Sequence, residues 1–141
     1  MLKTERIRDK AGLDAAFAIR THVFVEEQGV PVEREMDEHD ASALHVLAYY
    51  EEKPVATGRM RMLDGMAKLE RICVLAECRK SGAGKAIMLK LESIAQEQGA
   101  AGLKLNAQRS AEGFYKRLGY STISGEFMEE GIPHVTMTKP L

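Results

Sequence analysis

The sequence predicts one mixed α/β domain, with a mostly antiparallel sheet flanked by helices on both faces. Its hydrophobic pattern gives the order β-α-β-β-β-α-β-α-β-β over residues 1–141. The middle of the chain indicates an antiparallel meander, and a glycine-rich turn then joins a strand to an amphipathic helix. The 141 residues are 45% hydrophobic and 29% charged, which is typical of a globular domain with a core. No repeat or flexible linker divides the chain.

The N-terminal part is expected to form a strand, a helix and an irregular segment. Residues 2–8 alternate weakly and predict a strand. Asp9 is a candidate N-cap for a helix whose apolar residues, through Phe24, recur at helical spacing. This helix should end near Gly29. Residues 33–40 are acidic and have no period, so we expect a loop or a short helix there.

The next part predicts an antiparallel meander of three strands. Residues 44–50 form the first strand and residues 55–63 the second, with a turn over residues 51–54. Asp64-Gly65 is a strong hairpin signal. Residues 66–75 should therefore return as the third strand.

The C-terminal part predicts two helices and three strands. Residues 84–98 carry a single apolar face and form the longer helix. Residues 103–107 follow as a strand, which should lie parallel to its neighbour because a helix intervenes. A short helix over residues 111–118 and closing strands over residues 121–127 and 134–138 complete the domain.

Charge and composition narrow the class of function. The net charge is −1, so the bulk charge favours neither nucleic acid nor an anionic membrane surface. The chain has no run of about 18 apolar residues and no signal sequence, so we expect a cytoplasmic protein. Cys73 and Cys78 are expected to be free thiols, and without a second pair or a nearby histidine they predict no metal site.

A glycine-rich segment, residues 79–85, supplies the clearest chemical signal. A strand that runs into Gly82-x-Gly84 and then a helix presents free N–H groups at the positive end of the helix dipole. Glycine lets a phosphate approach the backbone closely. Arg79, Lys80 and Lys85 add local positive charge. The segment therefore predicts a site for an anionic phosphate.

Two common phosphate-binding loops do not fit this segment. A P-loop needs glycine and Ser/Thr at positions occupied by Arg79 and Ala86. The dinucleotide fingerprint needs a third glycine, where the chain has Ile87. Both interpretations are excluded.

The segment from Val74 to Lys85 instead resembles motif A of the GNAT N-acetyltransferases, a strand followed by Arg/Gln-x-x-Gly-x-Gly/Ala and a helix. A second segment, from Gln108 to Tyr120, is similar to the family's Asn-x-x-Ala-x-x-x-Tyr-x-x-x-Gly-Phe, with Gln and Tyr at its two ends. Residues 20–31, 37–40 and 127–135 further resemble the ElaA/YjcF-like bacterial branch. The resemblance extends over nearly the whole chain and implies the GNAT fold.

The resemblance implies acetyl-CoA as cosubstrate and no metal. It places the cofactor contacts on a strand end, on the glycine loop and on the second motif. These residues are Ile72, Cys73, Val74, Arg79, Lys80, Ser81, Gly82, Ala83, Gly84, Lys85, Gln108 and Tyr115. Residues 71–74 should separate from residues 103–107 to admit the pantetheine arm, and a backbone N–H near Cys73 and Val74 should polarise the thioester carbonyl.

The implied mechanism is direct attack of an amine on the thioester in a ternary complex. Tyr115 is expected to protonate the departing thiolate, although packing in the core is its alternative. Glu70 is the first candidate for the general base, and a salt bridge with Arg61 or Arg71 is its alternative. His134, Glu26 and Glu27 are further candidates. An acyl-cysteine at Cys73 would need a neighbouring base that the sequence does not place there.

The acceptor is expected to be a primary amine of a small molecule or peptide. It should enter between the first helix, residues 33–40 and the closing hairpin, with Glu26, Glu27, Asp37 and His134 as contacts. The acidity of this region suits a cationic amine, but an acidic segment can also be plain solvated surface. A homodimer through the C-terminal strands is compatible with the sequence.

Two other functions remain open at this stage. Arg20-x-x-x-Phe24 followed by Asp37-x-x-Asp40 also resembles autoinducer synthases, which share the fold and use acyl-carrier protein and S-adenosylmethionine. These are usually longer and contain tryptophan, and this chain has Trp 0. The third possibility is a non-catalytic sensor of acetyl-CoA. Tyr115 argues against it, because a protein that only binds acetyl-CoA needs no general acid.

Overall fold

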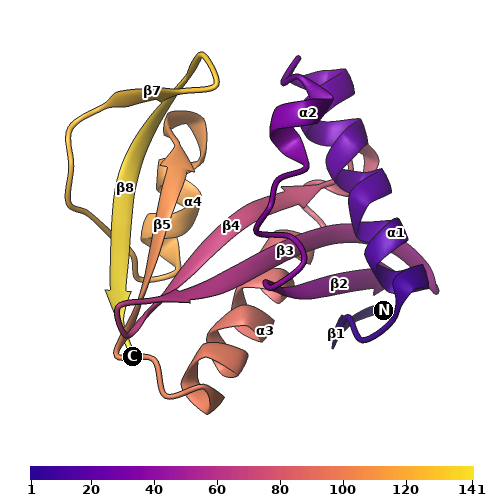
Figure 1. Cartoon of the computed structure of the whole chain (residues 1–141), viewed down its shortest axis with the longest axis horizontal. Helices are drawn as coiled ribbons and strands as arrows, with labels where there is room; N and C mark the ends of the chain where they lie inside the picture. Colours follow the sequence, from indigo (N-terminus) through magenta and orange to yellow (C-terminus); the bar gives the residue numbers. More distant parts are fainter.

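The computed structural model describes all 141 residues, and its elements follow the expected order with several additions (Figure 1). The strands are β1 (Leu2–Arg6), β2 (Leu44–Tyr50), β3 (Lys53–Leu63), β4 (Met66–Val74), β5 (Gly102–Gln108), β6 (Ser121–Thr122), β7 (Phe127–Glu129) and β8 (Ile132–Pro140). The α-helices are α1 (Lys10–Arg20), α2 (Val32–Glu35), α3 (Ala83–Glu97) and α4 (Glu112–Arg117). The other helical segments are η1 (Thr21–Glu27), η2 (Ala76–Cys78) and η3 (Arg109–Ala111).

One sheet of eight strands contains all of these strands. Its order is β1-β2-β3-β4-β5-β8-β6, with β7 paired to β8, and only β4 and β5 run parallel. The prediction of one strand over residues 121–127 is wrong. β6 ends at Thr122, and the Ile123 N–H still donates to the Thr136 carbonyl at 2.9 Å. The Thr136 N–H then donates to the Ser124 side-chain Oγ at 2.8 Å, so a side chain replaces the next backbone partner and the chain turns before β7.

The first helix begins where the cap predicts and changes its winding further on. The Asp9 carboxylate accepts a 2.8 Å hydrogen bond from the Gly12 N–H, which satisfies one of the free donors of α1. From Thr21 the helix continues as the π-helical segment η1. Gly29, at φ 77°, follows η1 in the left-handed region and ends the helix. Wider turns of this kind are frequent at functional sites.

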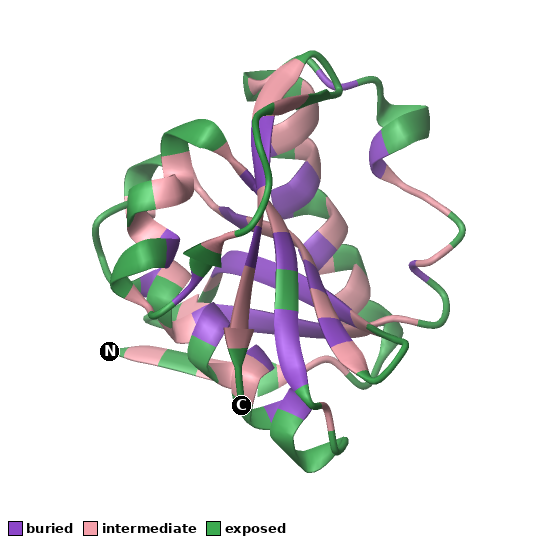
Figure 2. Ribbon diagram, turned by 90° about the vertical axis from the view of Figure 1, so that its left-hand side faces the viewer, coloured by how far each residue is buried: buried purple, intermediate pink, exposed green.

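Buried residues lie along the strands and on one side of the helices (Figure 2). Those that are hydrophobic form two cores, one on each face of the sheet. On one face, α3 and α4 cover the larger core, which includes Ile87, Leu91 and Leu105. On the other, α1 and η1 cover a smaller core around Ile19 and Cys73. Helices thus flank both faces, as the sequence predicts. None of the helices is both long enough and apolar enough to span a membrane.

A β-bulge in β4 determines which side chains of this strand lie on the same face of the sheet. Thr57 pairs with Cys73 and Arg59 with Glu70, so β4 has one residue more than β3 between these two pairs. Arg71 lies in this stretch at φ 57°, a conformation that side chains rarely adopt. Gly58 lies opposite, where a Cβ would come within 2.6 Å of Ile72 Cδ1. The extra residue shifts the alternation, so that both Glu70 and Cys73 face α1 and α2.

Candidate active site

The two parallel strands separate at the bulge. β4 and β5 pair only from Met66 with Gly102 to Leu69 with Leu105. The expected separation of residues 71–74 from residues 103–107 is therefore confirmed in its main feature. The Leu75 N–H donates to the Val55 carbonyl of β3 at 2.9 Å. Because successive N–H groups of a strand point to opposite edges, that of Val74 points into the gap.

The glycine loop begins α3 at the same end of β4. Gly82 has φ 90°, which favours glycine, and Ala83 opens a helix of 15 residues. A Cβ on Gly84 would lie 3.3 Å from Phe114 Cζ, so the residue is also small for packing. The N–H groups of the first helical turn have no partner within the helix. This arrangement fits a pyrophosphate.

Arg79 is not free at this loop. Its two terminal nitrogens donate to the Glu27 carboxylate at 2.6 and 2.8 Å, and its Nε donates to the Val74 carbonyl at 3.1 Å. The hydrogen bond from Arg79 lowers the pKa of Glu27. This ion pair ties the end of η1 to the phosphate loop and cancels part of the charge that the sequence assigns to the loop.

A cavity of about 810 Å³ extends through the gap between β4 and β5. On the α3 face it is lined by Gly82, Gly84 and Tyr115, and on the α1 face by Glu35 and Glu70. The β7–β8 hairpin contributes His134 to the same cavity. One cavity therefore connects the phosphate loop to a polar region on the opposite face of the sheet.

Tyr115 lies on this cavity and is 7% exposed. Its ring packs edge-on against Phe114 and Tyr120, with centroids 5.0 and 6.0 Å away. Its hydroxyl forms no hydrogen bond within the chain and is not among the fully buried polar atoms. Burial, and then the nearby Cys73, raise the pKa of Tyr115. The hydroxyl therefore stays protonated and is available to a ligand.

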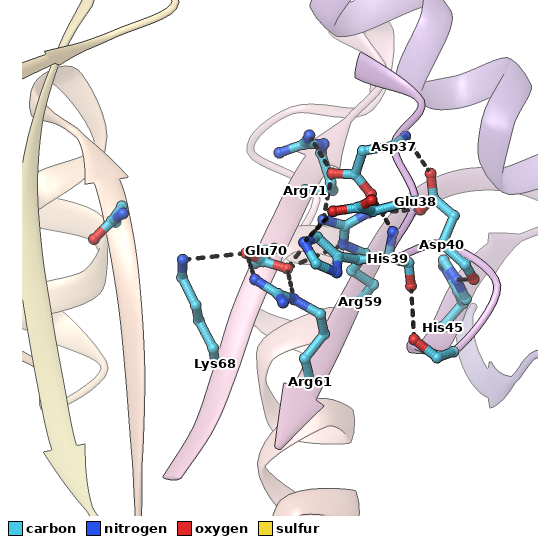
Figure 3. Close-up of polar contacts among 12 residues, drawn as sticks. Asp37, Glu38, His39, Asp40, His45, Arg59, Arg61, Lys68, Glu70 and Arg71 are labelled. Carbon is cyan, nitrogen blue, oxygen red and sulfur yellow. Dashed lines mark hydrogen bonds and ion pairs between the residues drawn. The ribbon is translucent and has the colours of Figure 1, made fainter. Parts of the chain in front are cut away.

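Glu70 belongs to a cluster of ion pairs (Figure 3). Its Oε1 accepts from Arg59 Nη2 at 3.0 Å and from Arg61 Nε at 2.7 Å, and Lys68 Nζ lies 3.3 Å from its Oε2. Burial would raise the pKa of Glu70, but the bond from Arg61 and the charges of Arg59 and Lys68 lower it to about 2. A carboxylate held by three cations is a poor proton acceptor, so we do not assign the base to Glu70.

The cluster predicts a loss of stability in acid. The pKa of Glu70 is about 2 in the folded protein, against an ordinary value of 4.5. A lowered pKa stabilises the fold above the unfolded value, and this contribution is lost as the pH falls through the folded one. We therefore expect the Tm to fall between about pH 4.5 and pH 2. Thermal unfolding across this range tests the prediction, and a drop equally steep in Glu70→Gln would contradict it.

The acidic residues expected at the acceptor site have other partners. Asp37 holds Arg59 at 2.8 and 2.9 Å and Arg71 at 3.0 Å, and it does not line the cavity. Glu26 lies 2.7 Å from His22 on the exposed side of η1. Glu27 holds Arg79. Arginine and histidine side chains of the chain thus offset much of the acidity of this region.

His134 and Gln108 lie on the cavity. His134 is 6% exposed and stacks on Phe127 at 6.1 Å between ring centroids. Its Nδ1 lies 2.7 Å from the Ile132 carbonyl, which requires a proton on Nδ1. Its Nε2 is then the acceptor in the neutral ring, and it lies 3.5 Å from Glu129 Oε2. Gln108 donates to the Gln28 side chain at 2.9 Å.

Cys73 is poorly suited to covalent catalysis. It is 6% exposed, and burial, followed by the charge of Glu35, raises the pKa of its thiol. A thiol that resists ionisation is a weak nucleophile. Cys73 and Cys78 are both free thiols.

Most of the predicted site residues line the cavity. Those that line it are Glu70, Ile72, Cys73, Val74, Arg79, Lys80, Gly82, Gly84, Lys85, Gln108, Tyr115 and His134. Those that do not are Ser81, Ala83, Glu26, Glu27 and Asp37. Sequence reasoning missed Glu35 and Phe114, which also line it. Phe114 adjoins Tyr115 in the second motif, whereas Glu35 is one of several acidic residues in a segment without a period.

The chain is similar to acetyltransferases over nearly its whole length. The profile of the Acetyltransferase (GNAT) domain matches residues 13–141. The uncharacterized N-acetyltransferase YjcF of Bacillus subtilis is 48% identical over 139 residues, which cover 98% of this chain and 99% of YjcF. A solved structure from Lactobacillus plantarum has a TM-score of 0.92 and 29% identity, with 99% of this chain and 98% of that chain covered. Escherichia coli ElaA shares the fold, with a TM-score of 0.87 and 23% identity over 99% of each chain.

Proposed function

Because the chain belongs to the GNAT acetyltransferase family, we propose that it moves an acetyl group from acetyl-CoA to a primary amine of a small molecule or peptide. The amine attacks the thioester directly in a ternary complex. The observation that carries this proposal is that one continuous cavity passes through the β4–β5 gap. It connects the N-terminus of α3, which suits a phosphate, to a polar region that would accommodate an amine beside the thioester.

The chain supplies the groups that direct attack requires. Residues 79–85 hold the pyrophosphate through the first turn of α3, and the gap admits the pantetheine arm. The Val74 N–H then donates to the thioester oxygen as negative charge develops on it. Such a donor contributes about 3–4 kcal/mol to transition-state stabilisation.

Tyr115 donates its proton to the departing sulfur. Its own pKa is raised, but the burial that raises the pKa of the Cys73 thiol acts on any thiolate formed in the same cavity. The pKa of the Tyr115 hydroxyl and that of the departing thiol are thus both raised. Proton transfer from the hydroxyl to the sulfur therefore remains feasible.

His134 is our candidate for the base, since its Nε2 carries the acceptor lone pair of the neutral ring. Glu129 Oε2 lies 3.5 Å from this nitrogen and would stabilise the imidazolium that forms when the ring takes up the proton. We expect His134→Gln to lower kcat/KM about 100-fold, because an amide cannot take up the proton of the amine. Steady-state rates with an amine from the panel below test this, and a kcat/KM equal to that of the wild type would remove His134 from the mechanism.

A panel assay tests the proposed function. Acetyl-CoA is incubated with polyamines, aminoglycosides and a peptide library, and free CoA and acetylated products are measured. We expect both to appear in equal amounts for at least one amine. Lactone formed from acyl-carrier protein and S-adenosylmethionine would instead support an autoinducer synthase. Tight acetyl-CoA binding without turnover of any amine would support a sensor.

A further inference from the structure

One oxygen differs from the others in the cluster of carboxylates formed by Glu35, Asp37, Asp40 and Glu70, of which Glu35 and Asp40 are buried. Of their eight carboxylate oxygens, seven accept a hydrogen bond from an arginine or a backbone N–H. The eighth, Glu35 Oε2, is the one fully buried side-chain polar atom without a partner.

The rest of Glu35 is firmly held. Its Oε1 accepts from Arg20 Nε at 2.7 Å and lies 3.3 Å from Arg71 Nε. Its backbone carbonyl accepts from Arg20 at 2.7 Å and from Arg71 at 3.2 Å. The last torsion of a glutamate is soft, so the carboxylate can turn Oε2 toward the cavity while the backbone carbonyl keeps its hydrogen bond from Arg20.

The location of Glu35 points to the acceptor. Glu35 ends α2, its side chain is 1% exposed, and it lines the cavity. Val74, whose N–H faces the gap, lines the same cavity. Glu35 and this N–H therefore border the one space in which the amine and the thioester would meet.

A hydrogen-bond donor on a ligand, such as the N–H of an amine, would satisfy this oxygen. A buried acceptor without a hydrogen bond is costly, so a ligand that supplies a donor gains affinity there. The acetyl end of acetyl-CoA carries no N–H, whereas a primary ammonium brings three. Charge-assisted bonds of this kind are also the stronger ones.

We propose that Glu35 Oε2 binds the nitrogen of the acceptor amine and orients it toward the thioester. This inference rests on the proposed transfer to an amine. It makes Glu35 the residue that selects acceptors with an N–H over cations without one.

Glu35→Gln tests the inference with the primary amine that turns over fastest in the panel. The amide keeps an oxygen for Arg20 and removes the charged acceptor. We expect the KM for the amine to rise about 10- to 100-fold, with an unchanged Kd for acetyl-CoA. The trimethylammonium analogue of the amine, which has the charge but no N–H, should lose less affinity on this substitution than the amine does, because it loses only the coulombic attraction and no hydrogen bond.

Asp40→Asn is the matched control, since Asp40 also accepts a hydrogen bond from Arg20 but does not line the cavity. It should lower the Tm and leave the KM for the amine near the wild-type value. If Glu35→Gln does not fold, a wild-type crystal with CoA and the amine decides, and a nitrogen about 3 Å from Oε2 is expected.

The outcomes separate the two claims. A folded Glu35→Gln enzyme with an unchanged KM, or an amine nitrogen bound away from Glu35, would overturn this inference and leave the proposed function intact. If the wild-type protein acetylates no amine, the proposed function itself fails.

Discussion

Tyr115→Phe should bind acetyl-CoA as tightly as the wild-type protein and lose turnover about 100-fold or more. The substitution removes one hydroxyl and keeps the ring, so the edge-on contacts with Phe114 and Tyr120 remain. The thiolate then leaves without a proton donor. Isothermal titration with acetyl-CoA and the initial rate of CoA release measure the two quantities.

Tyr120→Phe is the matched control. Tyr120 is also buried, but its hydroxyl donates to Glu92 at 2.8 Å and does not line the cavity. Its loss should cost about 1 kcal/mol of stability and leave kcat unchanged. If Tyr115→Phe turned over at the wild-type rate, Tyr115 would be a packing residue, as composition alone would suggest.

Arg59→Met should lower the free energy of unfolding by about 3–5 kcal/mol. Arg59 is 1% exposed and donates to Asp37, Asp40 and Glu70 at 2.7–3.2 Å. Removing the guanidinium leaves three carboxylates without their shared cation. Denaturant unfolding at neutral pH, with the linear extrapolation, measures the change.

Arg61→Met provides the comparison for this prediction. Arg61 is more exposed, at 17% of its side chain, and its partner is Glu70 alone. Glu70 would still keep Arg59 and Lys68, so we expect a loss of only about 1 kcal/mol. Equal losses in the two variants would show that burial of the central guanidinium is not what makes the cluster important.

The cluster also explains the likeness to autoinducer synthases. Arg20 donates to Asp40 at 2.7 Å, and Asp40 accepts from Arg59 at 2.7 Å. These residues are buried and lie outside the cavity lining. The charged residues of this pattern therefore fix α1 and the segment after α2 to the sheet.

The parts of the fold with a strong local period could be predicted from the sequence. β2 matches its expected residues, 44–50, and α3 differs by one residue at each end from the expected 84–98. Each has an apolar pattern that needs no information from elsewhere in the chain. The bulge at Arg71 has no such pattern, because it depends on the pairing of β3 with β4. It was therefore missed.

The candidate site also has a part that the sequence predicts and a part that it does not. The glycine loop and Tyr115 belong to short contiguous motifs, so the sequence places them. The partners of Glu70 lie on β3 and within β4, and those of Glu35 lie on α1 and β4. Burial and ion pairing of such groups arise only when distant segments meet. An acidic segment therefore looks like a cation site in sequence but is mostly neutralised in the fold.

Mass spectrometry of one reaction mixture tests direct acetyl transfer most directly. The protein is mixed with acetyl-CoA, first alone and then with an amine from the panel, and the intact protein and the amine are weighed together. We predict that the protein stays unmodified throughout and that the acetyl group appears on the amine. An acetyl group on Cys73 before the amine is added, or acetyl-CoA that binds without acetylating any amine, would contradict direct transfer at this cavity.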